Sequence, residues 1–311
     1  MSGSRVYLSI SIDCECDKGP QWQVARPLSF RGVKGGMAER LHPLFMSHRA
    51  RPTYLLSAEL FDDAESLEVL RDLGRSAELG THLHGEFVPP DAFVPNETKA
   101  FQRDYPAALE RAKLTALTDS FRRAFDRKPT SFRAGRFGIG ESSLTILREL
   151  GYAVDSSVTP FIDWSDKGTP LSFDGAPTQP YHPDERAPER VGDSPLLEVP
   201  VTIRPARLRG LPAIGRKLEP RWLRPSWGTP EGIVAVAIDE IRAARRFQAD
   251  RVVVLNAMFH NVEVVAGASP YAKDEGGVRA ILQRLDALLS FAAREGIDVV
   301  GLTDIAELVG S

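Results

Sequence analysis

Alternating apolar and polar side chains mark the first strand that the sequence predicts, over residues 6–17. One set of alternate positions is apolar: Leu8, Ile10, Ile12, Cys14 and Cys16. The other set is small or acidic: Ser9, Ser11, Asp13 and Glu15. Because successive strand side chains point to opposite faces, the two acids share a face with the serines. Small polar residues that lead into acids at the carboxyl end of a strand are typical of the inside of an α/β barrel, where catalytic groups gather.

Strand-like and helix-like patterns alternate along the rest of the chain. Further strands are predicted over 53–57, 78–84, 130–135, 152–157, 196–202, 251–258 and 298–303. Helices are predicted over about 36–50, 62–76, 99–127, 140–151, 230–247 and 275–295, with a break or kink at Pro106. This alternation favours a single α/β domain with a parallel sheet, spanning residues 1–311. The Pro-, Gly- and Asp-rich segment near 160–195 is long for a bare loop, so we expect an irregular insertion or small hairpin that covers the site.

Composition narrows the class of protein without identifying a chemistry. The 311 residues are 42% hydrophobic and 26% charged with a net charge of -3, which is ordinary for a globular protein and argues against a nucleic-acid partner. No long apolar run or signal-like segment is present, so we expect no membrane insertion and a cytoplasmic location. Cys14 and Cys16 lie two apart on one strand face, and we expect two buried thiols rather than a disulfide or a zinc site.

Histidine is scarce, with six in the chain, and its placement is therefore informative. His82 and His84 end the strand 78–84 on one face, and His260 lies just past the strand 251–258. Together with Asp13 and Glu15, they bring five ionisable groups to three strand ends, an arrangement that a divalent metal would stabilise. Taken alone, His82 and His84 are equally compatible with a strand that carries one hydrogen-bonded and one exposed histidine. The acids on the first strand favour the metal site.

Five ordered blocks within residues 6–303 resemble the polysaccharide deacetylase family, the metal-dependent carbohydrate esterases related to chitooligosaccharide deacetylases. The blocks are SIDCE at 11–15, GTHLHGE at 80–86, FRAGRFG at 132–138, VDSS at 154–157 and MFHN at 258–261. No single block is specific, but their order and their positions at strand ends carry the resemblance. It implies an irregular (β/α)7 barrel, a divalent metal with Zn²⁺ expected, and hydrolysis of an N-acetyl or similar small acyl group on a sugar or polysaccharide precursor.

The resemblance also implies roles for four polar residues. Asp13 matches the catalytic base, and Arg133 matches the arginine that keeps this acid charged and oriented. His260 matches the general acid that protonates the leaving amine, and Asp155 matches the acid that supports this histidine. The simpler interpretations are a surface ion pair for Arg133, a backbone-bonded His260 and a turn acid at Asp155.

The metal-binding motifs depart from the usual family pattern. Cys14 stands where the family usually has a metal-binding Asp, although it belongs to the apolar strand face, and Glu15 is the acid one residue later. In the second motif His82 matches the first His, Glu86 stands four residues later, and His84 is the natural substitute. We therefore expect Glu15, His82 and His84 to bind the metal, with Glu86 next. The alternative for Glu86 is a loop acid that faces solvent, and Asp13 is a further possible ligand.

Two loop residues are expected to contact substrate, and two other functions stay open. Arg136 follows the third block, and Trp164 carries an aromatic face that can stack on a sugar ring, although a buried loop anchor is the commoner role. The same fold and metal could instead hydrolyse a C–N bond in a small amide or ureide, or the protein could bind sugar without catalysis. A carbohydrate or small-molecule substrate is expected in each case. The sequence leaves its identity and the oligomeric state open.

Overall fold

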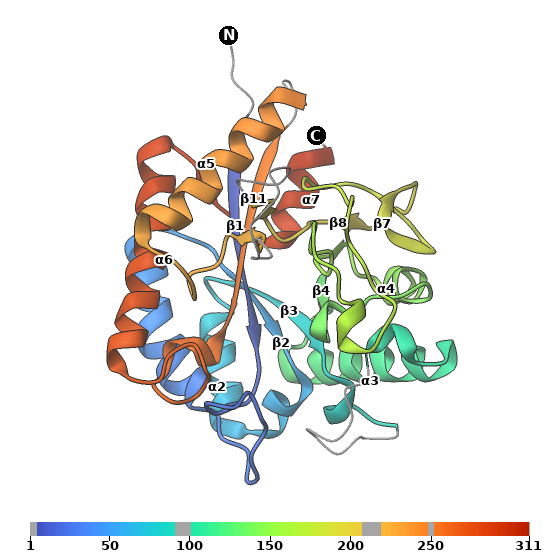
Figure 1. Cartoon of the computed structure of the whole chain (residues 1–311). Helices are drawn as coiled ribbons and strands as arrows, with labels where there is room; N and C mark the ends of the chain where they lie inside the picture. The colour runs from blue at the N-terminus through green and yellow to red at the C-terminus, as the bar shows by residue number, and fades with distance from the viewer. Residues whose placement is uncertain (1–4, 91–100, 207–218, 248–251, 311) are drawn as a thin grey trace.

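A curled sheet of parallel strands forms the centre of the protein (Figure 1), whose computed structural model describes residues 5–90, 101–206, 219–247 and 252–310. The strands follow one another in the order β11-β1-β2-β3-β4-β5-β8, and β12 also pairs with β1. Their bounds are β1 (Val6–Cys14), β2 (Thr53–Leu56), β3 (Glu78–Leu83), β4 (Ser131–Ala134), β5 (Val154–Asp155), β8 (Leu197–Glu198), β11 (Val253–His260) and β12 (Asp298–Val299). All of these pairings are parallel, so the carboxyl ends of the strands lie at one edge of the sheet.

The strand register places polar residues from distant parts of the chain opposite one another on neighbouring strands. The paired positions are Asp13 with His260, His82 with Arg133, and Asp155 with Glu198. Each pair joins two neighbouring strands near their carboxyl ends, which is where ligands bind in α/β folds.

The two ends of the sheet approach each other without forming a regular strand pair. The N–H of Thr202 donates to the carbonyl of Asn256 at 2.9 Å, and the side-chain amide of Asn256 donates to the carbonyl of Val199 at 3.1 Å. Asn256 lies on β11, whereas Val199 and Thr202 follow β8. The irregular segment after β8 therefore completes the curl, which confirms the predicted (β/α)7 type of barrel.

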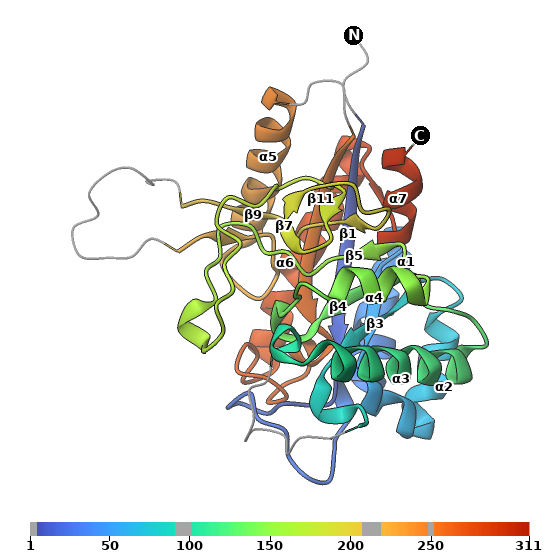
Figure 2. The same ribbon diagram turned by 90° about the vertical axis from the view of Figure 1, so that its right-hand side faces the viewer.

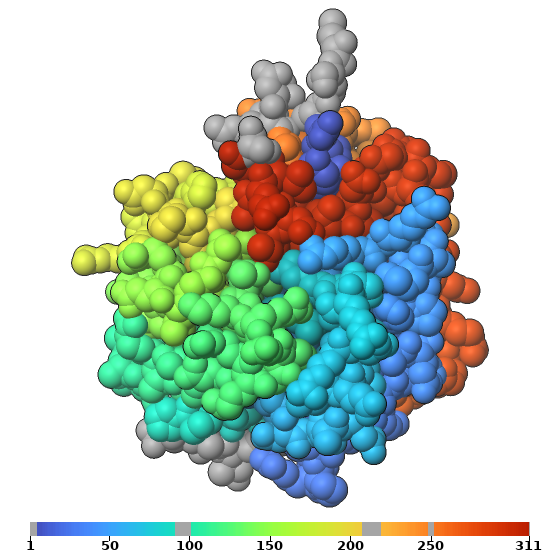
Figure 3. Space-filling model, turned by 180° about the vertical axis from the view of Figure 1, so that it is seen from behind, coloured from blue at the N-terminus to red at the C-terminus, as the bar shows by residue number. Residues whose placement is uncertain are grey.

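Helices cover the outside of the sheet. The helical segments are η1 (Gly32–Leu41), α1 (His42–Ser47), α2 (Ala64–Leu73), α3 (Ala107–Phe125), α4 (Ser143–Leu150), α5 (Pro230–Phe247), α6 (Glu275–Glu295) and α7 (Leu302–Gly310). The pair α5 and α6 packs beside β11, and α3 packs on α4 at the other side of the sheet (Figures 1 and 2). Seen from behind, the C-terminal segment (red) lies above the segments drawn in cyan and green on the outer surface of the molecule (Figure 3). Within the described residues, none of the helices has the length and apolar character needed to cross a membrane.

The alternation along β1 separates the core from the inside of the barrel. Its apolar side chains are fully buried in a cluster with residues of η1, α1 and α6: Leu8, Ile10, Ile12 and Cys14. Ser9 and Ser11 on the other face are equally buried, as expected for the lining of a barrel. Cys14 and Cys16 are free, buried thiols, which confirms that prediction.

Some predicted element bounds are wrong, for identifiable reasons. Helix α3 begins directly after Pro106, because proline lacks an N–H and is accommodated at a helix start. The predicted closing strand 298–303 ends at Val299, and α7 follows, with the Asp304 carboxylate accepting from the N–H of Gly301 at 2.9 Å. The bounds of α5 and α6 are those predicted. Residue 99, the predicted start of a helix, and residue 251, the predicted start of a strand, lie outside the described residues.

The segment near 160–195 contains a hairpin, as its composition indicated. The short segment η6 (Ser165–Lys167) precedes the antiparallel strands β6 (Pro183–Asp184) and β7 (Ala187–Val191). A second antiparallel pair joins β9 (Ile203–Arg204) to β10 (Arg221–Trp222). That the chain forms a single domain stays a prediction.

Candidate metal centre and active site

Three side chains converge beyond the carboxyl ends of β1 and β3. Glu15 follows β1, His82 lies on β3, and His84 follows β3. Oε1 of Glu15 lies 3.2 Å from Nε2 of His82 and 2.9 Å from Nε2 of His84. One ligand atom from each residue lies within 4.8 Å of the others, and all three residues are buried. Two imidazoles and one carboxylate are a donor set that Zn²⁺ and similar divalent ions prefer.

The second ring nitrogen of each histidine is engaged on the far side of the ring. Nδ1 of His82 lies 3.0 Å from the carbonyl oxygen of Arg133, and Nδ1 of His84 lies 3.3 Å from the carboxylate of Glu86. Metal-binding histidines ordinarily donate their other N–H to such an acceptor, which fixes the tautomer and leaves Nε2 for the metal. The residues present therefore fit a divalent cation.

Glu86 stands behind His84 rather than among the converging donors. Its carboxylate also pairs with the guanidinium of Arg136 at 2.7 Å. Burial raises the pKa of Glu86, but His84 and Arg136 together bring it well below its usual range. Glu86 was expected as a metal ligand and Arg136 as a substrate contact. The structure places both in one chain of contacts that orients His84.

Lys18, which the sequence reasoning missed, adds a buried positive charge to the cluster. Its Nζ lies 2.6 Å from Oε2 of Glu15. Burial lowers the pKa of Lys18, but Glu15, Cys16 and Glu59 together raise it more, so the ammonium stays charged. Burial raises the pKa of Glu15, and His84 and Lys18 bring it well below its usual value. For His84, burial lowers the pKa while Glu15 and Glu86 raise it, to about 9. The positive charges of Lys18 and His84 thus lie beside the negative charges of Glu15 and Glu86 within the cluster.

Asp13 is held by a fully buried arginine. Nη1 of Arg133 donates to Oδ1 of Asp13 at 2.7 Å, and Nη2 donates to the hydroxyls of Ser11 at 2.6 Å and Ser156 at 2.8 Å. Burial raises the pKa of Asp13, but Arg133, with help from His82 and His260, brings it below its usual value. The small serines on the inner face therefore leave room for the guanidinium and accept its hydrogen bonds.

The second oxygen of Asp13 faces both the metal donors and His260. Oδ2 lies 3.9 Å from Nε2 of His82 and 3.9 Å from Nε2 of His260. Both distances are too long for a direct hydrogen bond. Oδ2 is therefore positioned to accept a proton from a third group between the two histidines.

His260 is oriented by Glu263, a second residue that the sequence reasoning missed. Oε1 of Glu263 lies 2.7 Å from Nδ1 of His260 and accepts from the N–H of His260 at 3.1 Å. Glu263 also pairs with buried Arg224 and accepts from Ser226. The spacing of the acid three residues after a strand-ending histidine is that of a capping box and was the available signal. Arg224 and Lys18 lie in irregular segments and gave no such signal.

Asp155 was expected to support His260; its hydrogen bond is to Ser157, and the acid that contacts His260 is Glu263. Asp155 accepts from Oγ of Ser157 at 2.6 Å and faces Glu198 across the β5–β8 pair. Burial raises the pKa of Asp155. Burial and the negative charge of Asp155 raise the pKa of Glu198 well above its usual value. The strand register aligns Asp155 with Glu198, and a supporting role for Asp155 toward His260 stays a prediction.

Trp164, the other expected substrate contact, lies one aromatic ring away from Arg133. Its indole stacks on Phe137 with ring centroids 5.7 Å apart, and Phe137 lies 5.9 Å from the guanidinium carbon of Arg133. Trp164 is partly exposed and lines a groove together with Trp222 and Trp227. A substrate contact by Trp164 stays a prediction.

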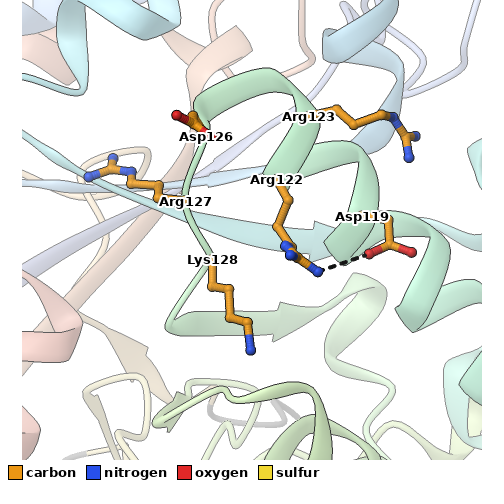
Figure 4. A pocket seen from close by; sticks show the side chains of 6 residues that line it. All are labelled: Asp119, Arg122, Arg123, Asp126, Arg127 and Lys128. Atoms are coloured by element: carbon orange, nitrogen blue, oxygen red, sulfur yellow. Dashed lines mark ion pairs between the residues drawn. The ribbon is translucent and has the colours of Figure 1, made fainter.

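A second hollow, at the C-terminal end of α3, has a different character (Figure 4). Its lining residues come from the last turns of the helix and the residues after it: Asp119, Arg122, Arg123, Asp126, Arg127 and Lys128. Basic side chains at a helix C-terminus are stabilised by the helix dipole. Arg122 lies 3.7 Å from Asp119 in an exposed ion pair. The hollow is a charged surface feature and lies outside the strand-end site.

No protein-family model and no curated protein sequence matches this chain. Its structure is similar to that of a candidate polysaccharide deacetylase from Mycobacterium smegmatis, with 16% identity, 99% of this chain and 91% of the other covered, and a TM-score of 0.58. A candidate glycoside hydrolase/deacetylase from Parabacteroides distasonis has 12% identity, coverage of 98% and 71%, and a TM-score of 0.66. Puue allantoinase has 15% identity, coverage of 98% and 90%, and a TM-score of 0.60. The curled parallel sheet and these similarities give the chain the fold of the polysaccharide deacetylases.

Proposed function

We propose that this protein is a metal-dependent hydrolase that removes an N-acetyl or similar small acyl group from a sugar or polysaccharide precursor. The observation that carries the proposal is the convergence, at one edge of the sheet, of three metal donors, an arginine-held acid and a glutamate-held histidine. The similarity to the candidate deacetylases from M. smegmatis and P. distasonis supports it.

Glu15, His82 and His84 would hold the metal, and two imidazoles favour Zn²⁺. When bound, such an ion polarises an acyl carbonyl and lowers the pKa of a coordinated water. Glu86 fixes the ring of His84, and Lys18 holds the second oxygen of Glu15. These two residues orient the ligands rather than contact the reacting atoms.

Asp13 is the proposed general base and His260 the proposed general acid. The lowered pKa of Asp13 keeps it ionised at neutral pH, and Oδ2 accepts a proton from the attacking water while Oδ1 stays bonded to Arg133. Glu263 fixes the ring of His260 through Nδ1, and Nε2 of His260 would give a proton to the departing amine. Arg133 acts through Asp13 and is therefore a positioning residue.

A second candidate is hydrolysis of a C–N bond in a small amide or ureide. The similarity to Puue allantoinase favours it, and the same acid, base and metal donors would serve. The tryptophan-lined groove beside the site favours a sugar over a small molecule. A non-catalytic sugar-binding role is disfavoured because Asp13 and His260 are both held in place by buried partners.

The test compares substrates on protein stripped of metal and reloaded with Zn²⁺ or Co²⁺. Acetate release from tetra-N-acetylchitotetraose and N-acetylglucosamine is measured against ring opening of allantoin. We expect metal-dependent acetate release that Asp13→Asn removes and that Glu141→Gln, a change to an exposed acid, leaves intact. Full activity without metal, or in Asp13→Asn, would refute the mechanism, and selective turnover of allantoin would establish the second candidate.

A further inference from the structure

A fully buried lysine on α3, Lys113, donates hydrogen bonds to the segment that follows β3. Its Nζ lies 2.9 Å from the carbonyl oxygen of Gly85, 2.5 Å from that of Val88 and 2.6 Å from that of Pro90. An ammonium group carries three N–H donors on one atom, which matches these three acceptors. Lys113 therefore ties α3 to residues 85–90, which we call the anchored segment.

Burial of this ammonium is costly, which indicates that its hydrogen bonds are needed. The side chain of Lys113 is 0% exposed. Removing an ammonium from water costs free energy that a neutral side chain of similar length, such as methionine, does not incur. The compensation lies in the carbonyl groups, because a buried carbonyl without a donor is itself destabilising. Lys113 is thus suited to fixing a backbone rather than to filling space.

The anchored carbonyls lie on both sides of Glu86 in the chain. Glu86 belongs to the short helical segment η3 (Gly85–Phe87), and its carboxylate lies 3.3 Å from Nδ1 of His84. The guanidinium of Arg136 contacts the same carboxylate at 2.7 Å. A shift of the backbone on either side of Glu86 would change its distance to His84. The ring orientation of His84 therefore depends on where Lys113 holds the segment.

Tyr105, shortly before α3, restricts the anchored segment at a second point. A Cβ atom added at Gly85 would lie 2.1 Å from Oη of Tyr105, which is closer than two such atoms approach. The ring of Tyr105 in turn lies 6.0 Å from Nζ of Lys113, at the distance of a cation–π contact. Close packing therefore favours glycine at residue 85, and the segment has little room to move beside α3.

We propose that Lys113 is a positioning residue for the candidate metal centre. By fixing the anchored segment, it holds Glu86 against His84 and so keeps Nε2 of His84 directed toward the metal. The inference rests on the proposed function for the identity of the metal donors, whereas its test measures metal binding and requires no turnover. Because Lys113 acts through Glu86, its contribution to metal affinity disappears when the carboxylate of Glu86 is removed.

Metal affinity is measured on the full chain, stripped of metal, by competition for Zn²⁺ against a chromogenic chelator. We expect Lys113→Met, which keeps the apolar stem and removes the ammonium, to weaken Zn²⁺ binding about tenfold, as for other groups that support metal-binding histidines. Lys128→Met, the same change at an exposed lysine, is the matched control and should bind Zn²⁺ as the wild type does. Unchanged affinity in Lys113→Met, with folding verified by circular dichroism, would overturn the inference.

A double-mutant cycle with Glu86→Gln separates positioning from a general loss of stability. We expect Lys113→Met to weaken Zn²⁺ binding by less than about twofold when it is made in Glu86→Gln, because the contact that it supports is already lost. A general loosening of the barrel would instead weaken binding equally in both backgrounds. Equal losses with and without the carboxylate of Glu86 would therefore overturn the inference.

Lys113→Gln is the milder variant for the case in which Lys113→Met does not fold. Its amide offers two N–H donors to the three carbonyls. We expect about threefold weaker Zn²⁺ binding, the size of one lost hydrogen bond, and again only while the carboxylate of Glu86 is present. In that case, unchanged affinity in Lys113→Gln, or a loss that persists in Glu86→Gln, would overturn the inference.

The inference and the proposed function can fail separately. Zn²⁺ binding that depends on Lys113 through Glu86, without acetate release by the metal-loaded protein, would remove the proposed function and leave the positioning role. Metal-dependent acetate release, together with the same Zn²⁺ affinity in wild type and folded Lys113→Met, would support the function and overturn the inference.

Discussion

Two pairs of buried acids lie near the carboxyl ends of strands in the same sheet, and their pKa values are shifted in opposite directions. Asp13 and Glu15 at the end of β1 face an arginine, a lysine and histidines, and their pKa values lie below the usual range despite burial. Asp155 and Glu198 on β5 and β8 face each other, and burial raises the pKa of both. Equal burial therefore does not set the charge of a carboxyl group; the partner that it meets does.

The orientation of the Arg133 guanidinium explains much of the difference between the two pairs of acids. Arg133 donates hydrogen bonds to Asp13, Ser11 and Ser156. Its charge also lowers the pKa values of Asp155 and Glu198, but by less than burial raises them. The pKa values of the first pair are therefore lowered, and those of the second pair are raised. Variants that change an acid or its partner in either pair test whether the partners set the two opposite pKa shifts.

The largest expected effect is on stability, from Arg133→Met. It leaves the Asp13 carboxylate buried without its cation, which costs about 3–5 kcal/mol. Arg111→Met is the control, because Arg111 pairs with Glu149 on the surface and contributes roughly 0–1 kcal/mol. Urea-induced unfolding measures both. Similar losses in the two variants would mean that Arg133 is not the partner that Asp13 requires.

Asp13→Asn should lower kcat about thousandfold, the size expected for loss of a general base. The bound metal should be retained, because the three converging donors do not include Asp13. Asp155→Asn should lower kcat by less than about tenfold, because Asp155 contacts Ser157 and Glu198 rather than His260. Initial rates and metal content are measured on folded protein. A large loss in Asp155→Asn would restore the catalytic role that the sequence indicated for it.

Glu86→Gln tests the acid that stands behind a metal-binding histidine. Losing the carboxylate partner of His84 should weaken metal binding about 10–100-fold, as for other acids in this position. Competition against a chromogenic chelator measures the affinity, with Glu141→Gln as the control. Unchanged affinity in Glu86→Gln would show that the ring of His84 needs no support from this residue.

The smallest effect concerns Asp155 and Glu198 and depends on pH. Because the folded-state pKa of Glu198 is raised, the folded protein holds a proton that the unfolded chain has released above about pH 4.3. The free energy of unfolding therefore falls as pH rises from that value toward the folded-state pKa. The amide side chain of Glu198→Gln cannot ionise, so the variant lacks this fall. Between pH 4 and pH 8, the free energy of unfolding of the variant should therefore rise by roughly 1 kcal/mol relative to that of the wild type.

Urea titrations at both pH values provide the measurement, and Glu141→Gln should show no such dependence. A difference between Glu198→Gln and wild type that stays the same at pH 4 and pH 8 would mean that Glu198 is ionised in the folded protein.

Local patterns were sufficient to predict a parallel α/β fold and the convergence of Glu15, His82 and His84 in a candidate metal site. The two-residue period of a strand places Asp13 and Glu15 together with the serines and places His82 beside His84, whatever the rest of the chain does. Parallel strands joined by helices then bring their carboxyl ends to one edge. The groups at several strand ends were therefore expected to meet, and they do.

The partner of each group was decided only by the tertiary structure. Lys18 reaches Glu15 and Glu263 reaches His260 through irregular segments, whose conformation has no short period to identify it. Asp155 meets Glu198 because of a register between strands, which depends on how the whole sheet curls. The sequence determined which ionisable groups gather at the edge, because strand periodicity is local. The structure decided which of them are paired, charged or neutral, because those properties depend on contacts between residues far apart in the chain.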